Sequence, residues 1–280
     1  MIKISFVTVC YKTPNLIRQL LRGFESLNLP YSFEYLLVDN AAGDGTGDMV
    51  KQRYPWVKLM EMPRNVGFGA ANNSAFEQAQ GEYVMLINPD LTVFANEVEK
   101  LVAFADENPD VGLAGPRLLN PDLTLQRSFH RFPNVFIPLY RRTALGSTRF
   151  GKRAVDHYLM READISQTQD VDGLYGSAIL IRKRALEDIG HFDERFFMYF
   201  EDVDLCRRAW ESGWRVVYAP VAEFVHYHQR ESEVKRFWNL ISNPTARTHV
   251  KSGIKYYLKY VGKKHPRESV RFLPKRLDRN

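Results

Sequence analysis

The chain has 280 residues, a formal net charge of +6 and only two cysteines, Cys10 and Cys206. With 45% hydrophobic residues it has enough apolar material for one large α/β domain or two small ones. The cysteines lie far apart without metal-ligand spacing, which predicts buried thiols in a reducing compartment and excludes a disulfide framework.

No stretch reaches the roughly 20 apolar residues of a membrane-spanning helix. The first residues are apolar too briefly for a signal peptide and lack a small-residue cleavage site. We therefore expect a cytoplasmic protein, or one attached from the surface to the inner face of the cytoplasmic membrane.

Apolar runs alternate with helical periodicity along the first 116 residues. This pattern predicts a mostly parallel central sheet flanked by helices, with ligands gathering beyond the carboxyl ends of the strands. The expected strands are 4–10, 35–39, 57–62, 83–87 and 111–115, and the expected helices begin near residues 14, 46, 69 and 95.

The second half of the sequence is less regular. Residues 117–168 are rich in Arg, Phe and Pro with weak periodicity, which predicts a functional or mobile loop. An apolar segment at 178–181, strands near 215–218 and 222–227, and two terminal helical segments are expected to follow.

Polar side chains stand directly after several expected strands. Asp39 and Asn40 follow the second strand and Tyr11 follows the first. A carboxylate and an aromatic face at adjacent strand ends could hold a nucleobase. The alternative is that Asp39 only caps a loop and Tyr11 only packs, and the residues alone favour this alternative.

The segment Asn88-Pro89-Asp90 follows the hydrophobic strand 83–87. A carboxylate there could coordinate Mg²⁺ or Mn²⁺ together with a diphosphate, because hard cations take oxygen ligands and often share them with phosphate. The alternative is a plain turn, since all three residues favour turns.

Three acids, Glu201, Asp202 and Asp204, follow the five large hydrophobic residues 196–200. Negative charge suits a helix N-terminus, which would explain the acids but not the hydrophobic residues. Carboxylates at the edge of an apolar pocket explain both, and such a setting favours a general base.

His226 and His228 follow an apolar run on alternating positions, which puts both side chains on one face of a strand. A lone histidine is usually structural. With a distant aspartate, however, a histidine could complete a metal site.

The ordered series of segments is more specific than any of them alone. It comprises FVTVCYKTP, LLVDNAAGDGT, RNVGFGAANN, GEYVMLINPD, GSAILIRKRALEDIGHFDERFFMYFEDVDLCRRAWESGWRVVYAP and VHYH. Over residues 3–232 this series resembles the inverting nucleotide-sugar transferases of glycosyltransferase family 2, in the rhamnosyltransferase-like branch that builds bacterial surface polysaccharides.

The resemblance implies the GT-A fold, an α/β architecture with a C-terminal helical tail. The catalytic domain would span 1–240, with a nucleotide-sugar half to about 116 and an acceptor half over 117–240. A basic helical tail would span 241–280. The resemblance also implies the donor-binding residues Tyr11, Asp39, Asn40, Asn65, Gly67, Asn73 and Asn88.

Asn88-Pro89-Asp90 occupies the place of the family's Asp-x-Asp motif, so the resemblance implies that Asp90 and His226 bind Mg²⁺ or Mn²⁺. It places the catalytic base at Asp202, with Glu201 adjacent. Asn88 departs from the motif because it offers only a neutral oxygen, which bears on the strength of metal dependence.

The chain is most basic at its end, where residues 247–280 hold eleven Lys or Arg against two acids. Arg247, Lys251, Lys255, Lys259 and Lys263 recur every four residues and predict one helical face. The residues expected on another face are Ile254, Tyr257, Leu258 and Val261. Such a helix is typical of a membrane surface, but a solvated face packed on the domain by its apolar side remains an equal alternative.

By resemblance, the donor is first dTDP-rhamnose and second a UDP-linked hexose, and the acceptor is a saccharide or lipid-linked saccharide. A non-catalytic nucleotide-sugar-binding protein is the rival that Asn88 supports. A dinucleotide-dependent oxidoreductase is excluded because no G-x-G-x-x-G follows the first strand. No nucleic-acid partner is expected, because the first 246 residues carry a net charge of −3.

Overall fold

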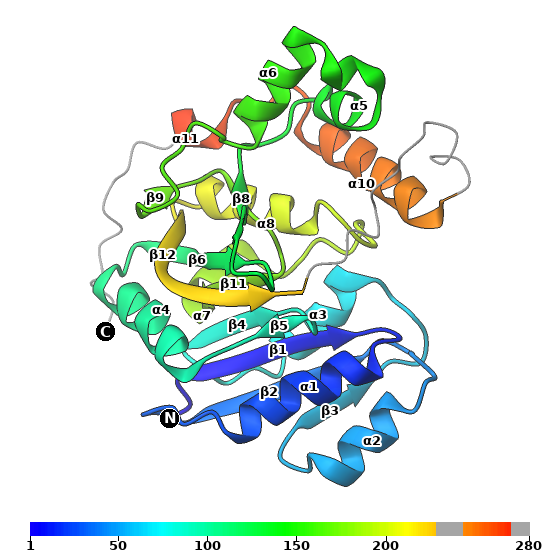
Figure 1. Ribbon diagram of the computed structural model, residues 1–280, viewed down its shortest axis with the longest axis vertical. Coiled ribbons are helices and arrows are strands. Elements are labelled where there is room, and N and C mark those ends of the chain that lie inside the picture. The colour runs from blue at the N-terminus through cyan, green and yellow to red at the C-terminus, as the bar shows by residue number, and fades with distance from the viewer. Residues whose placement is uncertain (228–242, 270–280) are drawn as a thin grey trace.

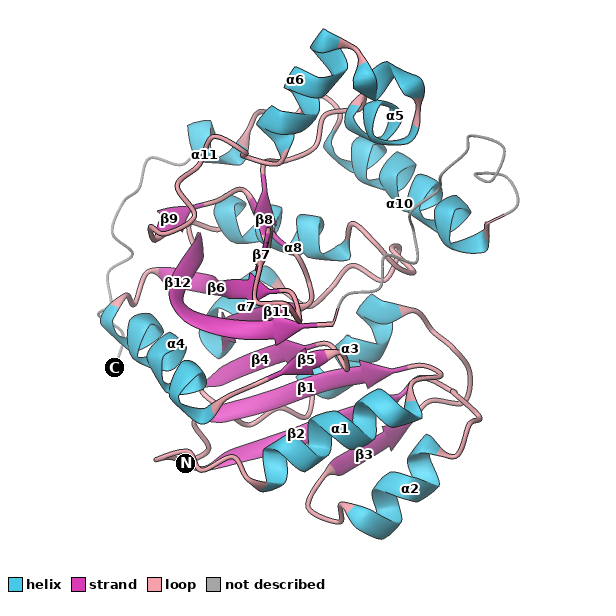
Figure 2. Ribbon diagram, viewed as in Figure 1, coloured by secondary structure: helices cyan, strands magenta, loops and turns pink. Residues whose placement is uncertain are grey.

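This computed structural model describes residues 1–227 and 243–269. A ten-stranded sheet forms the centre of the fold. Its central path is β3-β2-β1-β4-β11-β6-β12-β5, and helices cover both faces (Figures 1 and 2). The strands are β1 Ile4–Cys10, β2 Phe33–Asp39, β3 Lys58–Glu61, β4 Tyr83–Ile87, β5 Leu91–Thr92, β6 Val111–Leu119, β7 Leu125–Gln126, β8 Phe129–His130, β9 Gln169–Asp170, β10 Gly173–Leu174, β11 Ala178–Arg182 and β12 Arg215–His226.

The helices lie between the strands in the first half and cluster above the sheet in the second (Figure 1). They are α1 Pro14–Glu25, α2 Thr46–Arg53, α3 Phe68–Phe76, α4 Ala95–Glu107, α5 Ile137–Arg142, the 3₁₀ helix η1 Ala144–Ser147, α6 Arg149–Tyr158, α7 Lys183–Ile189, α8 Glu201–Glu211, α10 Pro244–Tyr260 and α11 Pro266–Ser269.

Strands β1 to β4 form the parallel half of the sheet, as the alternation of strands and helices predicts. The side chains of β1 are buried along its whole length, because helices cover both faces. Cys10 is paired with Asp39 in register. The residues that follow β1 and β2 therefore emerge at the same edge.

The other half of the sheet is mixed, because β11 runs antiparallel to both β4 and β6. Antiparallel pairing brings the start of β11 to the carboxyl end of β4, so Ala178 pairs with Ile87. Strand β12 is one strand of 12 residues with a register shift between Ala219 and Glu223, where the sequence predicts two strands.

Residues 117–168 are not the irregular loop that the sequence predicts. They contain β7, β8, α5, η1 and α6, and the helices α5 and α6 lie at one end of the molecule in Figure 1. Thr148 caps α6 by accepting a hydrogen bond from the backbone N–H of Gly151 at 3.1 Å. These helices have only 4 to 10 residues, too few turns for a clear periodicity.

Helix α10 packs on the segment that precedes α8. Asn243 caps its start, Tyr256 and Tyr260 are buried, and Ser252 donates a hydrogen bond to the carbonyl of Met198 at 2.8 Å. The boundary proposed at residue 240 lies outside the described residues, and so does His228. Among the described helices none is both long and apolar enough to cross a membrane.

The orientation of α10 differs from the interpretation in which its apolar side packs on the domain. Ile254, Leu258 and Val261 are 54%, 70% and 77% exposed, although that interpretation predicts that they are buried. Tyrosines and small residues make the packing face instead, because Ser252 and Gly253 let the helix approach the Phe200 ring closely.

Candidate active site

The edge beyond β1 and β2 carries Tyr11, Asp39 and Asn40. Tyr11 is 43% exposed, whereas Asp39 and Asn40 are buried. One carboxylate oxygen of Asp39 accepts a hydrogen bond from the backbone N–H of Ala42 at 2.8 Å. Asp39 therefore does hold its own loop, and its second oxygen points toward α2, 3.4 Å from where a Cβ on Gly47 would lie.

Asn40 braces the loop 65–67 by hydrogen bonds through both ends of its amide. Its nitrogen donates to Asn65 Oδ1 at 3.0 Å and to the Gly67 carbonyl at 3.2 Å, and its oxygen accepts from the Val66 N–H at 2.9 Å. Asn40, Asn65 and Gly67 are thus brought together at one edge, with Asn40 holding the loop 65–67 in place.

Gly67 is where the donor side meets the second half of the chain. Its φ is +91°, and a Cβ there would lie 2.2 Å from the carbonyl oxygen of Phe197. The next residue, Phe68, donates its N–H to that same carbonyl at 2.8 Å. Only glycine fits this approach of two backbones.

Asn73 has a different position from the wall that the resemblance implies. From α3 its amide nitrogen donates to the Phe192 carbonyl at 2.9 Å and to Glu194, while its oxygen accepts from the Phe192 N–H. Its hydrogen bonds fix the loop after α7 and form a second tie between the two halves.

Asp90 and His226 lie together at the end of β4. His226 Nε2 is 3.3 Å from Asp90 Oδ1, and the Tyr227 N–H donates to the Asp90 carbonyl at 2.9 Å. The pairing of β12 with β5 produces this contact, since His226 is in register with Leu91.

A divalent cation fits this pair of side chains. His226 Nδ1 lies 2.8 Å from Gln126 Oε1, so a ring that carries its single proton on Nδ1 would direct the Nε2 lone pair at the Asp90 carboxylate. Two acceptors facing each other are stabilised by a cation between them. Adjacent ligands of an octahedral ion are about 3 Å apart, close to the observed separation.

Two protein ligands would leave most of the coordination shell to phosphate and water. Among residues 1–227 and 243–269 there is no group of three His, Cys, Asp or Glu placed to hold an ion. A donor diphosphate would supply the missing oxygens, as is usual for Mg²⁺ at phosphate sites.

A short path of hydrogen bonds connects the end of β4 to Asp202. The Asn88 N–H donates to the Ser177 carbonyl at 2.9 Å, and the N–H of the preceding residue, Gly176, donates to Asp202 Oδ2 at 2.9 Å. Asn88 and Asp202 thus contact two consecutive residues, Ser177 and Gly176, which directly precede β11. The antiparallel β11 is what brings them together.

Glu201 and Asp202 are adjacent but differ in environment. Glu201 is 5% exposed, and its Oε2 has no hydrogen-bond partner among the described residues. Burial, and next the charge of Asp202, raise the pKa of Glu201 well above its usual value. Glu201 is therefore harder to ionise than an exposed carboxyl group, while Asp202 is half-buried and accepts hydrogen bonds from Gly176 and from the N–H of Val203 at 2.8 Å.

The backbone before α8 adopts a rare conformation. Tyr199 and Phe200 have φ values of +70° and +68°, a region that costs non-glycine residues roughly 1–3 kcal/mol each. The α10 side chains hold them there: the ring of His249 lies 4.9 Å from Tyr199 and 5.2 Å from Phe200. This turn aims the start of α8 toward Gly176.

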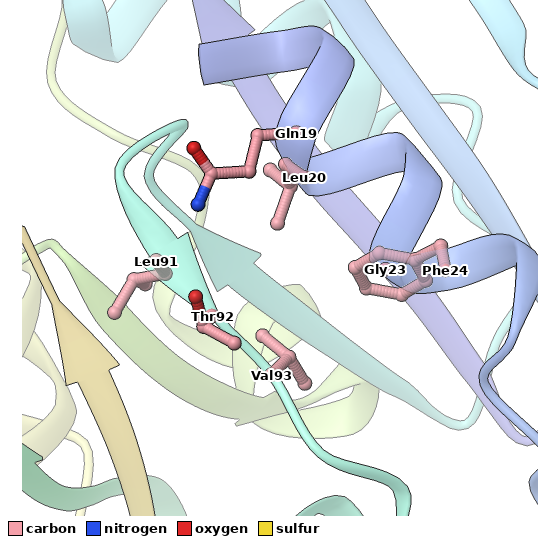
Figure 3. A pocket seen from close by; sticks show the side chains of 7 residues that line it. All are labelled: Gln19, Leu20, Gly23, Phe24, Leu91, Thr92 and Val93. Carbon is pink, nitrogen blue, oxygen red and sulfur yellow. The ribbon is translucent and has the colours of Figure 1, made fainter.

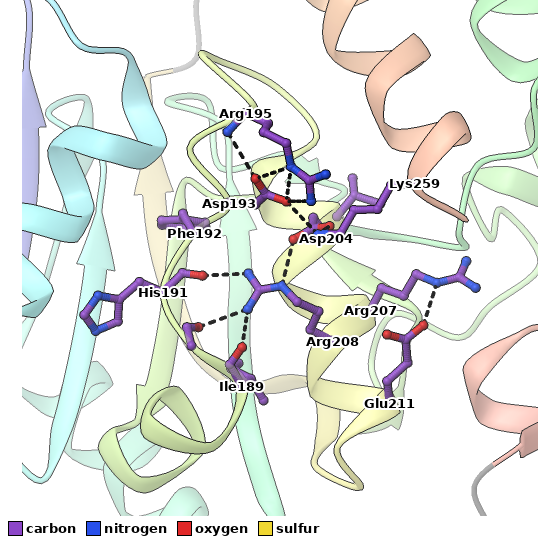
Figure 4. A network of polar contacts seen from close by, with 12 residues as sticks. Ile189, His191, Phe192, Asp193, Arg195, Asp204, Arg207, Arg208, Glu211 and Lys259 are labelled. Atoms are coloured by element: carbon purple, nitrogen blue, oxygen red, sulfur yellow. Dashed lines mark hydrogen bonds and ion pairs between the residues drawn. The ribbon is translucent and has the colours of Figure 1, made fainter. Parts of the chain in front are cut away.

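Asp204 anchors α10 to α8 (Figure 4). Its carboxylate is fully buried and accepts hydrogen bonds from Arg208 at 2.8 Å, Tyr260 at 2.7 Å and Lys259. Lys259 also binds Asp193 at 2.7 Å. The third acid of the cluster is therefore structural, which the sequence did not distinguish from the other two.

His130 is a residue near the site that sequence reasoning missed. It is fully buried, stacks on Tyr158 at 5.3 Å, and lies 4.9 Å from the Tyr175 ring. Burial lowers its pKa, and the opposing effect of the Asp202 carboxylate shows that the two side chains interact. A single histidine in an irregular segment carries no sequence signal for this position.

A separate hollow of about 30 Å³ lies between α1 and the start of β5, lined by residues that include Gln19, Leu20 and Thr92 (Figure 3). It has room for about one water molecule and contains no acid. It plays no part in the site.

Comparison with known proteins identifies the family. The family described as glycosyl transferase family 2 matches residues 5–190. The N-acetylglucosaminyl-diphospho-decaprenol L-rhamnosyltransferase of Mycobacterium tuberculosis is 34% identical over 203 residues, 69% of this chain and 66% of that protein. The rhamnosyltransferase WbbL of Escherichia coli K12 is 26% identical over 208 residues, 68% of this chain and 69% of that protein.

The chain thus spans just under two thirds of the length of the mycobacterial relative. The crystal structure of GalNAc-T7 with UDP, GalNAc and Mn²⁺ superimposes with a TM-score of 0.60 at 14% identity, over 82% of this chain and 44% of that one. At that identity the likeness concerns the fold alone, and it confirms the predicted GT-A architecture. The chain is a glycosyltransferase that belongs to glycosyl transferase family 2.

Proposed function

We propose that the chain is a metal-dependent, inverting glycosyltransferase in which Asp202 is the general base. The observation that supports the proposal is the path from Asn88 through Ser177 and Gly176 to Asp202, because it connects the metal-motif segment to the base candidate.

In the proposed reaction Asp202 accepts a proton from an acceptor hydroxyl. The hydroxyl oxygen attacks the anomeric carbon from the face opposite the diphosphate, and the bond from that carbon to the diphosphate oxygen breaks with its electron pair. The anomeric configuration therefore inverts. General-base assistance of this kind typically contributes about 10²–10⁴-fold in rate.

The difference in burial favours Asp202 over Glu201 as the group that accepts the proton. Glu201 is 5% exposed, so an acceptor hydroxyl reaches its carboxyl group less readily than that of the half-buried Asp202. We propose that Glu201 supports the geometry of the base rather than reacting.

Asp90 and His226 would hold Mg²⁺ or Mn²⁺, with Asn88 adding a neutral oxygen. The bound cation would offset negative charge on the leaving diphosphate. On the donor side Tyr11 and Asp39 would contact the base, while Asn40, Asn65 and Gly67 would shape the wall beside the diphosphate.

The names of the two relatives support a rhamnose donor. Both are rhamnosyltransferases, and the mycobacterial one is named for a saccharide acceptor on a decaprenyl diphosphate. We propose dTDP-rhamnose as donor, a UDP-linked hexose as the second choice, and a lipid-linked saccharide as acceptor in surface polysaccharide synthesis at the inner face of the cytoplasmic membrane.

The donor and the metal can be tested together by thermal shift with a panel of nucleotide sugars, with and without Mn²⁺. The proposed donor should raise the melting temperature more in Mn²⁺ than in chelator. Asp90→Ala should lose this metal-dependent increment. Asp164→Ala is the matched control, because that exposed carboxylate bonds only within its own turn to Ser166, and it should behave as wild type.

Equal donor binding by Asp90→Ala and wild type in Mn²⁺ would remove Asp90 from the metal site. The rival function, donor binding without turnover, rests on the neutral side chain of Asn88. Slow hydrolysis of the bound donor in the absence of acceptor would exclude that rival.

A further inference from the structure

Two helical regions at one end of the molecule expose large apolar side chains. In the first, Phe136 and Leu139 of the α5 region are 56% and 44% exposed, and Phe150 of α6 is 73% exposed. In the second, Ile254, Leu258 and Val261 of the α10 region are at least 54% exposed. Monomeric proteins rarely leave such residues together without a partner.

The two regions are adjacent. Tyr257 of α10 donates a hydrogen bond to the Asn134 carbonyl, two residues before Phe136, at 2.8 Å. Ile254, Leu258 and Val261 follow the i, i+4, i+7 spacing of one helical stripe beside Tyr257. On the other side, the Tyr140 ring lies 6.4 Å from Phe136 and 6.0 Å from Phe150.

The charge of these regions is strongly positive. Residues 132–158 and 243–269 together hold twelve Lys or Arg against two acids, Asp156 and Glu268. Part of this charge serves the fold: Lys255 binds the Arg195 carbonyl, Lys259 binds Asp193 and Asp204, and Arg267 binds Asp172. Lys152, Arg153 and Lys251 are exposed.

Exposed apolar side chains among basic residues that far outnumber the acids are the chemistry of an interfacial helix at an anionic bilayer. A second copy of this chain would bring like charge against like charge. We propose that the α5–α6 region and α10 form a membrane-docking surface, made by Phe136, Leu139, Phe150, Ile254, Leu258 and Val261, that rests on anionic phospholipid.

The docking surface lies beside the base. Helix α10 packs on Phe200, two residues before Asp202, with its Tyr256 ring 5.4 Å from the Phe200 ring. An acceptor carried on a lipid would therefore reach Asp202 from the same side. The role of this surface in catalysis rests on the proposed function with its lipid-linked acceptor. The binding of the surface to lipid does not depend on that function.

The test is co-sedimentation of the full chain with phosphatidylcholine vesicles that contain or lack phosphatidylglycerol. Binding should require phosphatidylglycerol and weaken at high salt. Phe136→Ser should weaken binding about tenfold. Phe94→Ser is the matched control, because Phe94 is 47% exposed and precedes α4 as Phe136 precedes α5. Helix α4 lies at a distance from α5 and α6 in Figure 1.

A charge-reversal pair, Lys152→Glu and Lys251→Glu, should weaken binding about fivefold per residue. Failure to bind anionic vesicles, or equal binding by Phe136→Ser and Phe94→Ser, would overturn the proposal. So would a lipid-free dimer, seen by sedimentation velocity, that Phe136→Ser dissociates. Turnover on a soluble saccharide acceptor should be unchanged in Phe136→Ser. If wild type and the variants bind vesicles as expected but none of them shows turnover, the proposed function is refuted and the docking surface is not.

Discussion

The two sides of the candidate cleft are built in different ways. The donor side follows three strands, β1, β2 and β4, which pair in parallel and come from one contiguous stretch of chain. The base side combines residues 176–177, residues 192–204 and helix α10, which lie far apart in the sequence. The donor side is thus formed by segments that are neighbours in the sequence. The base side is formed by contacts between segments that lie far apart in it.

The difference shows in what stabilises each side. Asp39 is held by a hydrogen bond within its own loop, Asn40 by hydrogen bonds to the loop 65–67, and both by the parallel sheet. Asp202 depends on a strained turn at 199–200 that α10 supports, and on Asp204, which binds α10 directly. We therefore expect base-side changes to affect turnover and stability while donor affinity stays nearly constant.

The largest expected effect is that of Asp202→Asn on turnover. It removes the proton acceptor but keeps a side chain of the same size, so the rate should fall by about 10²–10⁴-fold. Donor affinity, measured by titration calorimetry with Mn²⁺, should stay within about twofold of wild type. Weak donor binding with residual turnover would instead place Asp202 on the donor side.

The next effect is that of Asp204→Ala on stability. The substitution leaves Lys259 and Arg208 without their buried partner, and breaking such an interaction costs about 3–5 kcal/mol. Urea unfolding at pH 7 measures the loss. Glu211→Ala is the control, since Glu211 forms a partly exposed pair with Arg207 worth at most about 1 kcal/mol. Equal losses in the two variants would contradict the anchoring role of Asp204.

The smallest effect is a pH-dependent gain in stability from Glu201→Gln. The raised pKa of Glu201 means that the folded protein keeps a proton that the unfolded chain releases above about pH 4.3. The free energy of unfolding of wild type should then fall by up to about 1.4 kcal/mol per pH unit above that point. That of Glu201→Gln should not fall for this reason.

The advantage of Glu201→Gln should therefore be absent below about pH 4 and grow as the pH rises toward neutrality, in melting curves taken across that range. A constant difference at all pH values would show that Glu201 does not retain its proton. Turnover should survive this substitution, in contrast to Asp202→Asn.

The sequence predicted the parallel strands of the first half well because their signals are local. Buried strands of 5 to 7 residues, each followed by polar residues, indicate both the sheet and the edge where Asp39, Asn40 and Asp90 gather. The motif series then predicted the family. The contact between Asp90 and His226 also agrees with the predicted pair, although a metal at that pair stays a proposal.

The base side was harder to predict because its determinants are tertiary. The acids at 201, 202 and 204 look alike in sequence, and only burial and partners separate the unpartnered Glu201 from the anchor Asp204. The sequence left open whether the apolar stripe of α10 packs on the domain, because periodicity cannot show that tyrosines and Gly253 provide the packing surface. His130 had no signal at all.

The central claim is that Asp90 and Asp202 serve one cleft, and a crystal structure of Asp202→Asn with Mn²⁺ and an intact nucleotide sugar tests it most directly. The anomalous signal of Mn²⁺ should lie against Asp90 and His226, with the anomeric carbon between the ion and residue 202. A metal bound elsewhere, or a sugar directed away from residue 202, would contradict the account.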